Sequence, residues 1–380
     1  MDEIIKILKE LVEHDSSTKD GANSLLELVI EKYLQPAGYA LKNFSFNGHN
    51  SVYASVNENY TPRILFLGHL DTVDAKGWEL HDPFKLAIEN ELAYGLGVLD
   101  MKAGVAAMLH LATTKVNPNI AYLFVTDEEI GGFNGAGKIV HLEDPLIKPD
   151  FVIAAEPSEM QIGISAKGFL NVEVAYKGKS AHSSKPEEGI NAIEQLSSYI
   201  QAVRSNSIFE KSNDLLGKTT FSQTLIKCLN ERENQVPDYC ETVVNLRYIP
   251  ELTREQILSV FNKTAKENYI EGGEIIVKEF GRAPHGFSVG CSTENVEVKK
   301  LAEIITNETG NVLYRGGQGA SDARFFAEKK IPVICFGPSG NGMHAPEENL
   351  NLDSFQKYIT ILEKYVEEIK WLSKKLGLKR

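Results

Sequence analysis

The sequence predicts an α/β fold in which a mostly parallel sheet domain is interrupted by a smaller, inserted α+β domain. Three observations support this prediction. Short, continuous apolar runs, typical of strands that are covered on both faces, recur along the chain. Amphipathic helical patterns lie between these runs, as in a sheet with crossover helices. The stretch from Lys167 to Gly281 departs from this alternation and has its own order of strands and helices.

The larger domain contains the alternating elements. Its predicted strands are the apolar runs Arg63–Leu67, Ala121–Thr126, Phe151–Ala155 and Pro332–Phe336. Its predicted helices are Asp2–His14, Asn23–Leu34, Lys102–Thr114, Thr293–Asn307 and about Asp353–Leu376. We expect the second helix to end before Pro36 because a proline ring cannot continue a helix.

The inserted domain is predicted as a strand, a helix, two strands, a helix and a strand. These elements are Phe169–Tyr176, Gly189–Arg204, Thr219–Leu229, Tyr239–Tyr248, Thr253–Tyr269 and Glu274–Phe280. The order β-α-β-β-α-β is that of the ferredoxin-like fold. We therefore expect a discontinuous catalytic domain, residues 1–166 and 282–380, and an inserted domain, residues 167–281, that serves in dimerisation or as a lid.

The 380-residue chain has the composition of a globular protein, with 42% hydrophobic and 24% charged residues. Its net charge of −12 gives no positive field for phosphate backbones, so no nucleic-acid partner is expected. Neither a signal peptide nor an apolar run of membrane-spanning length is recognisable, so we expect a cytoplasmic protein without membrane association. The cysteines form no CxxC pair, which favours separate thiols in a reducing compartment: Cys228, Cys240, Cys291 and Cys335.

Histidine and acidic side chains follow the predicted strands, or begin the helix that comes after a turn. In open α/β sheets, sites lie outside the carboxyl ends of the strands, so these side chains are expected to meet at one edge. Together they would repel one another unless divalent cations were bound, and nitrogen and oxygen ligands suit Zn²⁺, with Mn²⁺ or Co²⁺ as substitutes. The residues are His69, Asp71, Asp100, Asp127, Glu128, Glu129, Glu156 and His344.

Each of these residues taken alone also has a structural explanation. His69 could be a satisfied polar residue, and Asp100 could be the N-cap of the helix that follows it. Glu128 and Glu129 could form a solvated loop. Their common position at one sheet edge favours the metal site over these separate explanations.

Seven motifs occur in the order of a known family: GHLDTV, YGLGVLDMKAG, TDEE, EPSE, SAHSSKP, GASDARF and GMHAPEE. On these motifs the chain resembles, over nearly its whole length, the two-zinc aminoacylase and carboxypeptidase family. Acetylornithine deacetylase, succinyl-diaminopimelate desuccinylase and glutamate carboxypeptidase are members. The resemblance implies a zinc-dependent enzyme that hydrolyses linear amides, with two Zn²⁺ per subunit, and a homodimer.

The resemblance also assigns roles to residues. One zinc would be held by His69, Asp100 and Glu156, and the other by Asp100, Glu129 and His344, with Asp100 as the bridge. The general base for a metal-bridging hydroxide would be Glu128. Asp71 would hydrogen-bond the His69 imidazole and fix its tautomer. In the inserted domain, His182 matches the family histidine that donates to the developing oxyanion. In many members this histidine is supplied across a dimer interface. The residues expected to hold substrate are Asn234, Arg247 and Arg324.

The positions in the inserted domain have alternatives, because His182 could be a turn residue and Arg247 a surface strand residue. For the substrate, Glu156 and the WELHDPF segment favour a deacylase close to acetylornithine deacetylase. GASDARF is closer to the desuccinylase, although Ala320 replaces its usual threonine. We expect hydrolysis of an N-acyl amino acid, and the first substrate we expect is an ornithine- or lysine-like amino acid that carries an acetyl group. The alternatives are a desuccinylase, a dipeptidase or carboxypeptidase acting on short peptides, and a non-catalytic binding homologue, which the intact Glu128 disfavours.

Overall fold

The computed structural model describes residues 1–56, 61–142, 144, 147–281, 285–286, 288–317, 319 and 321–375. The chain divides into two compact units. Unit 1 contains residues 1–164, 290–315 and 321–380, and unit 2 contains residues 165–289 and 316–320. Unit 2 therefore extends further toward the carboxyl terminus than the predicted inserted domain, and it also includes residues 316–320.

The larger sheet has the strand order β1-β2-β6-β3-β7-β20-β8-β18, with β19 also paired to β8. The strands predicted from apolar runs are neighbours at its centre, where β3 runs parallel to β6 and β7, and β20 runs parallel to β7. The pairs β1–β2, β2–β6 and β8–β20 are antiparallel, so the sheet is mixed, and the α/β class is confirmed. The strands are β1 (Ala40–Phe46), β2 (His49–Ser55), β3 (Ile64–His69), β6 (Ile120–Val125), β7 (Phe151–Ala154), β8 (Ile162–Ala166), β18 (Val289–Gly290), β19 (Tyr314–Gly317) and β20 (Val333–Cys335).

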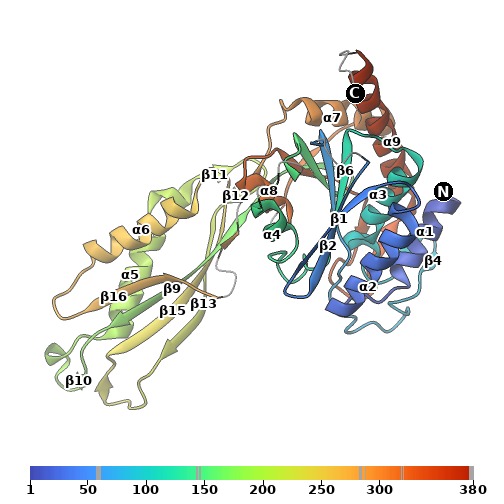
Figure 1. The fold of residues 1–380 in the computed structure, drawn as a ribbon. Helices are drawn as coiled ribbons and strands as arrows, with labels where there is room; N and C mark the ends of the chain where they lie inside the picture. The colour runs from blue at the N-terminus through green and yellow to red at the C-terminus, as the bar shows by residue number, and fades with distance from the viewer. Residues whose placement is uncertain are drawn as a thin grey trace. The chain divides into compact units, whose positions relative to one another are not determined.

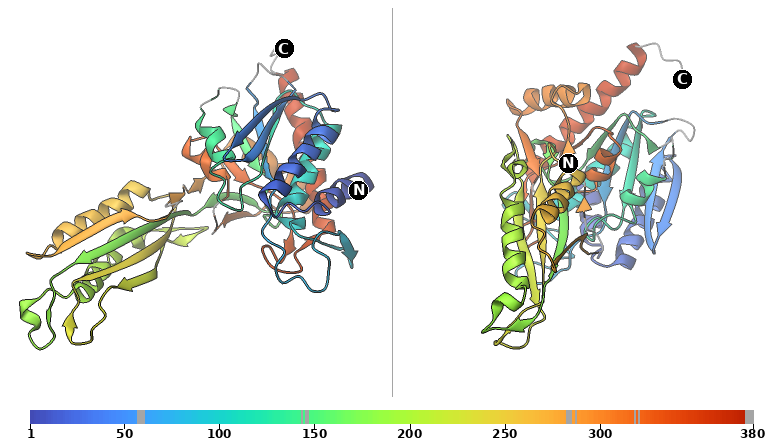
Figure 2. Two further views of the ribbon diagram at one scale, coloured as in Figure 1. Left: turned by 60° about the horizontal axis from the view of Figure 1, so that its bottom comes forward. Right: turned by 90° about the vertical axis from the view of Figure 1, so that its left-hand side faces the viewer.

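Helices cover both faces of this sheet. One hydrophobic core joins the central strands to α1, α2, α3, α7 and α9. Figure 1 shows α1, α2, α3 and α9 on one side of the sheet and α4 and α8 on the other, and Figure 2 gives two further views. The predicted end of the last helix, Leu376, lies outside the described residues. The helices are α1 (Asp2–Val12), α2 (Lys19–Val29), α3 (Ala103–Thr114), α4 (Ala136–His141), α7 (Val296–Thr309), α8 (Ala323–Glu328) and α9 (Leu352–Lys375).

Unit 2 has the predicted β-α-β-β-α-β order, with the strands arranged β13-β15-β9-β16 and every neighbouring pair antiparallel. Alternate residues of β9 and β15 face α5 and α6 and form a second core, because side chains point to opposite faces of a strand in turn. Helix α6 begins with a capping box formed by Thr253 and Gln256. The elements are β9 (Gly168–Lys177), α5 (Ala192–Arg204), β13 (Thr220–Cys228), β15 (Tyr239–Tyr248), α6 (Arg254–Glu267) and β16 (Glu274–Glu279).

Short elements complete the described structure. A small sheet β21-β22-β5-β4 flanks the Asp100 turn, and β10 pairs with β14 in unit 2. No helix within the described ranges is both long and apolar enough to cross a membrane. The short strands are β4 (Ala87–Glu89), β5 (Leu92–Tyr94), β10 (Ala181–His182), β11 (Ser212–Asn213), β12 (Gly217–Lys218), β14 (Gln235–Val236), β17 (His285–Gly286), β21 (Gly340–Asn341) and β22 (Asn349–Asn351).

Candidate metal centre

The site lies in unit 1, where the carboxyl ends of β3, β6 and β7 meet. These strands are parallel neighbours, so the residues that end or follow them lie at the same edge of the sheet. His69 is the last residue of β3, and Glu156 follows β7. Glu129 lies in the turn after β6, whereas Asp100 lies in the turn before α3. His344 lies between β21 and β22, with a left-handed backbone of φ 59°.

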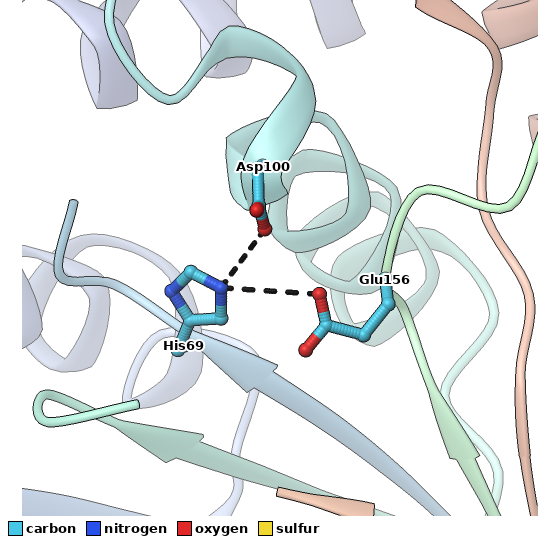
Figure 3. A group of neighbouring side chains, drawn as sticks. All are labelled: His69, Asp100 and Glu156. Carbon is cyan, nitrogen blue, oxygen red and sulfur yellow. Dashed lines mark hydrogen bonds and ion pairs between the residues drawn. The ribbon is translucent and has the colours of Figure 1, made fainter. Parts of the chain in front are cut away.

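The first ligand group consists of His69, Asp100 and Glu156 (Figure 3). His69 Nε2 lies 3.1 Å from Asp100 Oδ1 and 4.0 Å from Glu156 Oε2. The His69 side chain is only 2% exposed. Its other ring nitrogen, Nδ1, lies 2.9 Å from the backbone oxygen of Asp71, which leaves Nε2 as the atom that faces the two carboxylates.

The second group consists of Asp100, Glu129 and His344. His344 Nε2 lies 3.1 Å from Asp100 Oδ2 and 3.1 Å from Glu129 Oε1. Asp100 therefore presents one carboxylate oxygen to each imidazole. This is the arrangement expected of a carboxylate that bridges two cations.

These residues fit a pair of divalent cations. Each group offers ligand atoms that all lie within 4.8 Å of one another. Three nitrogen and oxygen ligands per ion suit zinc with an open coordination position. Burial alone would raise the pKa of Asp100, but bonds from His344 and His69 outweigh it and hold that pKa below its ordinary value. Bonds to Asp100 and Glu129 raise the pKa of His344 to about 10.

Glu128 lies beside these groups and belongs to neither of them. Burial raises the pKa of its carboxyl to about 8, and the acids Asp322, Asp100 and Glu129 add to this effect while His69 opposes it. A carboxyl with this pKa can take up and release a proton near neutral pH. Its position leaves it free for that exchange.

Asp71 contacts both the His69 imidazole and the turn after β6. The imidazole of His69 contacts the Asp71 backbone oxygen at 2.9 Å, whereas the Asp71 carboxylate lies 3.7 Å from the ring nitrogen. That carboxylate accepts hydrogen bonds from the backbone N–H groups of Glu128 and Glu129, at 3.2 and 3.0 Å. The carboxylate thus fixes the turn that carries Glu128 and Glu129 and lies within ion-pair distance of the imidazole, and its predicted role beside His69 stays a prediction.

Two buried acids near the site were missed from the sequence. The Glu348 carboxylate accepts the backbone N–H groups of Gly97, Leu99 and Asp100, each at 2.8 Å. Asp322 is 2% exposed, and burial, aided by the charge of Asp127, raises its pKa to about 7. Both residues stand in quoted motifs, but acidic residues in loops are mostly exposed, so the sequence held no signal for their burial.

Arg324 is buried in unit 1. Its guanidinium donates to the backbone oxygens of Ser321 and Gly131 and lies against the rings of Phe133 and Phe325, at 5.6 and 4.3 Å from their centroids. These contacts fix loops next to α8. The predicted contact of Arg324 with substrate therefore gains no support from them and stays a prediction.

The remaining predicted residues lie in unit 2. His182, in β10, is exposed and lies 2.8 Å from the Ser184 hydroxyl. The backbone oxygen of Asn234 accepts the N–H of Ser183 at 3.0 Å, so His182 and Asn234 are neighbours. Arg247 lies near the other end of β15, with its guanidinium carbon 5.5 Å from the Phe169 ring centroid.

Comparison with known proteins places these features in a family. Residues 65–368 match the peptidase family M20/M25/M40. The chain is 27% identical to the succinyl-diaminopimelate desuccinylase of Ehrlichia canis (strain Jake), over 96% of this chain and 97% of that protein. Its fold is similar to that of the aminopeptidase PepT from Bacillus cereus, with a TM-score of 0.75, 20% identity and coverage of 97% and 98%.

A further fold likeness is to YXEP from Bacillus subtilis, a dinuclear metal-binding peptidase of the M20 family. The TM-score is 0.65 at 14% identity, with coverage of 97% and 98%. The resemblance drawn from the motifs is thus confirmed. The chain belongs to the peptidase family M20/M25/M40, and it is a metal-dependent hydrolase of amide bonds.

Proposed function

We propose that this chain removes the acyl group from an N-acyl amino acid, and that N-succinyl-diaminopimelate is the first substrate to test. The observation that carries the proposal is the pair of ligand groups that share Asp100 beside the unliganded carboxyl of Glu128. The name of the 27% identical relative favours a succinyl group over the acetylornithine-like substrate expected from the sequence. Ala320, on which that expectation partly rested, lies outside the described residues.

We propose two zinc ions as the native metals, with Mn²⁺ and Co²⁺ as substitutes. The first would be held by His69, Asp100 and Glu156, and the second by Asp100, Glu129 and His344. When bound, such ions polarise the scissile carbonyl and lower the pKa of bound water. The imidazole and carboxylate donors and their burial support zinc rather than Mg²⁺ or Ca²⁺, which prefer oxygen ligands throughout.

In this proposal Glu128 takes the proton of the attacking water and passes it to the leaving amine. The Asp71 carboxylate holds the backbone of Glu128 in place through its bond to the N–H. A base held in this way loses little orientational freedom when substrate binds, which favours transfer between fixed positions.

Substrate binding would also use residues of unit 2. Within that unit, His182 lies beside β14, near the Tyr239 end of β15, whereas Arg247 lies near the other end. The eight residue steps from Tyr239 to Arg247 span about 27 Å at ~3.4 Å per residue. One small N-acyl amino acid cannot contact both residues in one chain. We therefore propose a homodimer in which the second copy supplies one of them.

The exposed edge of the unit 2 sheet supports this dimer. Strand β13 ends the sheet, and its Leu225 and Ile226 are 57% and 70% exposed. Unpaired edge strands with apolar side chains favour pairing with another chain. Replacing Ile226 with Lys is expected to yield a monomer by sedimentation, whereas Val116→Lys, an exposed position in unit 1, should leave the dimer intact. A wild-type monomer with full activity would contradict the proposal.

The substrate assignment is tested by a hydrolysis screen. Purified protein loaded with Zn²⁺, Mn²⁺ or Co²⁺ is given succinyl-diaminopimelate, acetyl-ornithine, acetyl-lysine and several dipeptides, with Glu128→Gln as the inactive control. The proposal is supported if kcat/KM is highest for the succinyl compound. If kcat/KM is highest for a dipeptide, the enzyme is a peptidase and the proposed substrate is wrong. Tight metal binding without hydrolysis of any compound would indicate the non-catalytic homologue.

A further inference from the structure

Cys228 and Cys240 stand opposite each other on neighbouring strands of unit 2. They are paired residues in the antiparallel register of β13 and β15. Cys228 is the last residue of the edge strand, and its thiol lies 3.4 Å from the backbone oxygen of Tyr239. The Cys228 side chain packs against the core that contains Cys240, so both thiols lie on the same face of the sheet.

This spacing suits a disulfide. Residues directly opposite in an antiparallel pair have Cα atoms about 4.5–5.5 Å apart, inside the range of about 4.4–6.8 Å that disulfides span. Their Cβ atoms are about 4.5–5.5 Å apart, however, and a disulfide draws them to about 3.5–4.5 Å. A bond formed here would therefore be strained, and strained disulfides are the ones most easily reduced.

The residues between the two cysteines include Asn234, which the sequence predicts to hold substrate. The loop 229–239 contains Asn234 and β14, which pairs with β10, the strand that bears His182. At the base of the loop, Gly178 N–H donates to the Asp238 backbone oxygen at 2.8 Å. A covalent link between Cys228 and Cys240 would close this loop.

We propose that Cys228 and Cys240 are a redox modification site: they form a reversible disulfide that locks the loop 229–239. The redox chemistry of this pair does not rest on the proposed hydrolysis. All four cysteines carry free thiols in the structure, as the sequence predicts, but the strand register brings two of them side by side.

The oxidant we name is a small disulfide such as glutathione disulfide. The thiolate of the half-buried Cys228 attacks it, forms a mixed disulfide and releases one glutathione thiolate. Cys240 then loses its proton, and its sulfur attacks the Cys228 sulfur and expels the second glutathione. The protein loses two electrons and two protons, and the oxidant is reduced to two thiols.

The order of these steps follows from exposure. Cys240 is 1% exposed, and burial together with the neighbouring Cys228 raises its pKa to about 11. Because the thiolate is the attacking form, Cys240 reacts poorly with an oxidant from solution. It can still attack a mixed disulfide on Cys228, since the two side chains are already adjacent.

The test treats the metal-loaded, full-length protein with glutathione disulfide, quenches it in acid, alkylates the free thiols and maps the unreduced peptides by mass spectrometry. We expect linked peptides containing Cys228 and Cys240, lighter by two hydrogens, with no retained glutathione and full reversal by dithiothreitol. Cys240→Ser should instead keep glutathione on Cys228, and Cys291→Ser should form the same link as the wild type. Unmodified thiols at both positions, or a stable glutathione adduct on wild-type Cys228, would overturn the site.

The locking of the loop has its own measurement. Amide hydrogen exchange is compared between the oxidised and the reduced wild-type protein, and in Cys228→Ser under both treatments. We expect slower exchange over residues 229–239 in the oxidised wild type and no difference in the variant. Equal exchange in both wild-type forms, with the disulfide present, would overturn the lock.

Discussion

Removal of the Glu348 carboxylate should weaken metal binding without touching a metal ligand. Glu348 is 2% exposed and accepts three backbone N–H groups from the turn that carries Asp100. Asp100 in turn offers one oxygen to each ligand group. Changes at such outer partners typically cost 10–100-fold in metal affinity, so Glu348→Gln is expected to weaken zinc binding by about that factor.

The stability of the metal-free protein should fall as well. A buried donor left without a partner costs about 1–3 kcal/mol, which sets an upper range of roughly 3–9 kcal/mol for Glu348→Ala. Water that enters the space can accept some of these N–H groups, so we expect the free energy of unfolding of Glu348→Ala to fall by about 3 kcal/mol. Glu348→Gln keeps one acceptor oxygen and turns its amide toward one N–H, so its loss should be about 1–3 kcal/mol.

The assay pairs zinc competition against a chelating dye with urea unfolding of the metal-free protein. Glu347→Gln is the matched control, because the Glu347 carboxylate accepts the N–H groups of Leu80 and His81. It should keep zinc affinity within about twofold. A folded Glu348→Gln protein with wild-type zinc affinity would refute the reasoning, since it would show that Asp100 holds its position without those bonds.

Three further outcomes are expected. Glu128→Gln should keep its zinc content by elemental analysis while turnover falls about 10²–10⁴-fold; near-normal turnover would remove Glu128 from the role of base. His182→Ala should lower kcat far more than it changes KM, because an oxyanion donor acts mainly in the transition state, and an unchanged kcat would contradict this. A bond to Glu347 raises the pKa of His81 above its ordinary value. The stability from that bond is therefore full below about pH 6.5 and is lost as the pH rises through the folded-state pKa. Urea unfolding of His81→Gln should accordingly differ most from wild type at low pH, and a constant difference would speak against the bond.

The central strands were predictable because strands covered on both faces leave uninterrupted apolar runs. The β1–β2 hairpin was missed because its strands mix polar and apolar residues. A signal was present: Asn47-Gly48 joins the strands with φ values of 51° and 79°, as a two-residue hairpin turn requires. The order of elements in unit 2 was predictable because apolar residues recur with a clear period in each of its strands and helices.

His69, Glu129 and Glu156 were predictable because they end or follow parallel strands, whose carboxyl ends meet at one edge. Asp100 and His344 lie outside these strands, before α3 and between β21 and β22, so strand ends alone did not place them. The contacts of Asp71 were not predictable, since a sequence does not state whether a carboxylate or a backbone oxygen faces an imidazole. The same limit applies to Cys228 and Cys240, whose pairing depends on a register that shifts between Gln223 and Leu225. A β-bulge moves every later pair by one residue. Such a shift decides whether two thiols meet.

One loop links the two ligand groups, and this link explains why Glu348 matters beyond its own bonds. The segment between β21 and β22 carries both His344, a member of the second group, and Glu348, which holds the turn of the shared Asp100. Movement of this loop would displace a ligand of one group and loosen the bridge of both. The neighbouring Glu347 bonds the His81 segment on the outer side of the loop and makes no bond to the Asp100 turn. The geometry of the metal centre therefore depends on the bonds of Glu348, which lie beyond the ligands and can be removed by a single substitution.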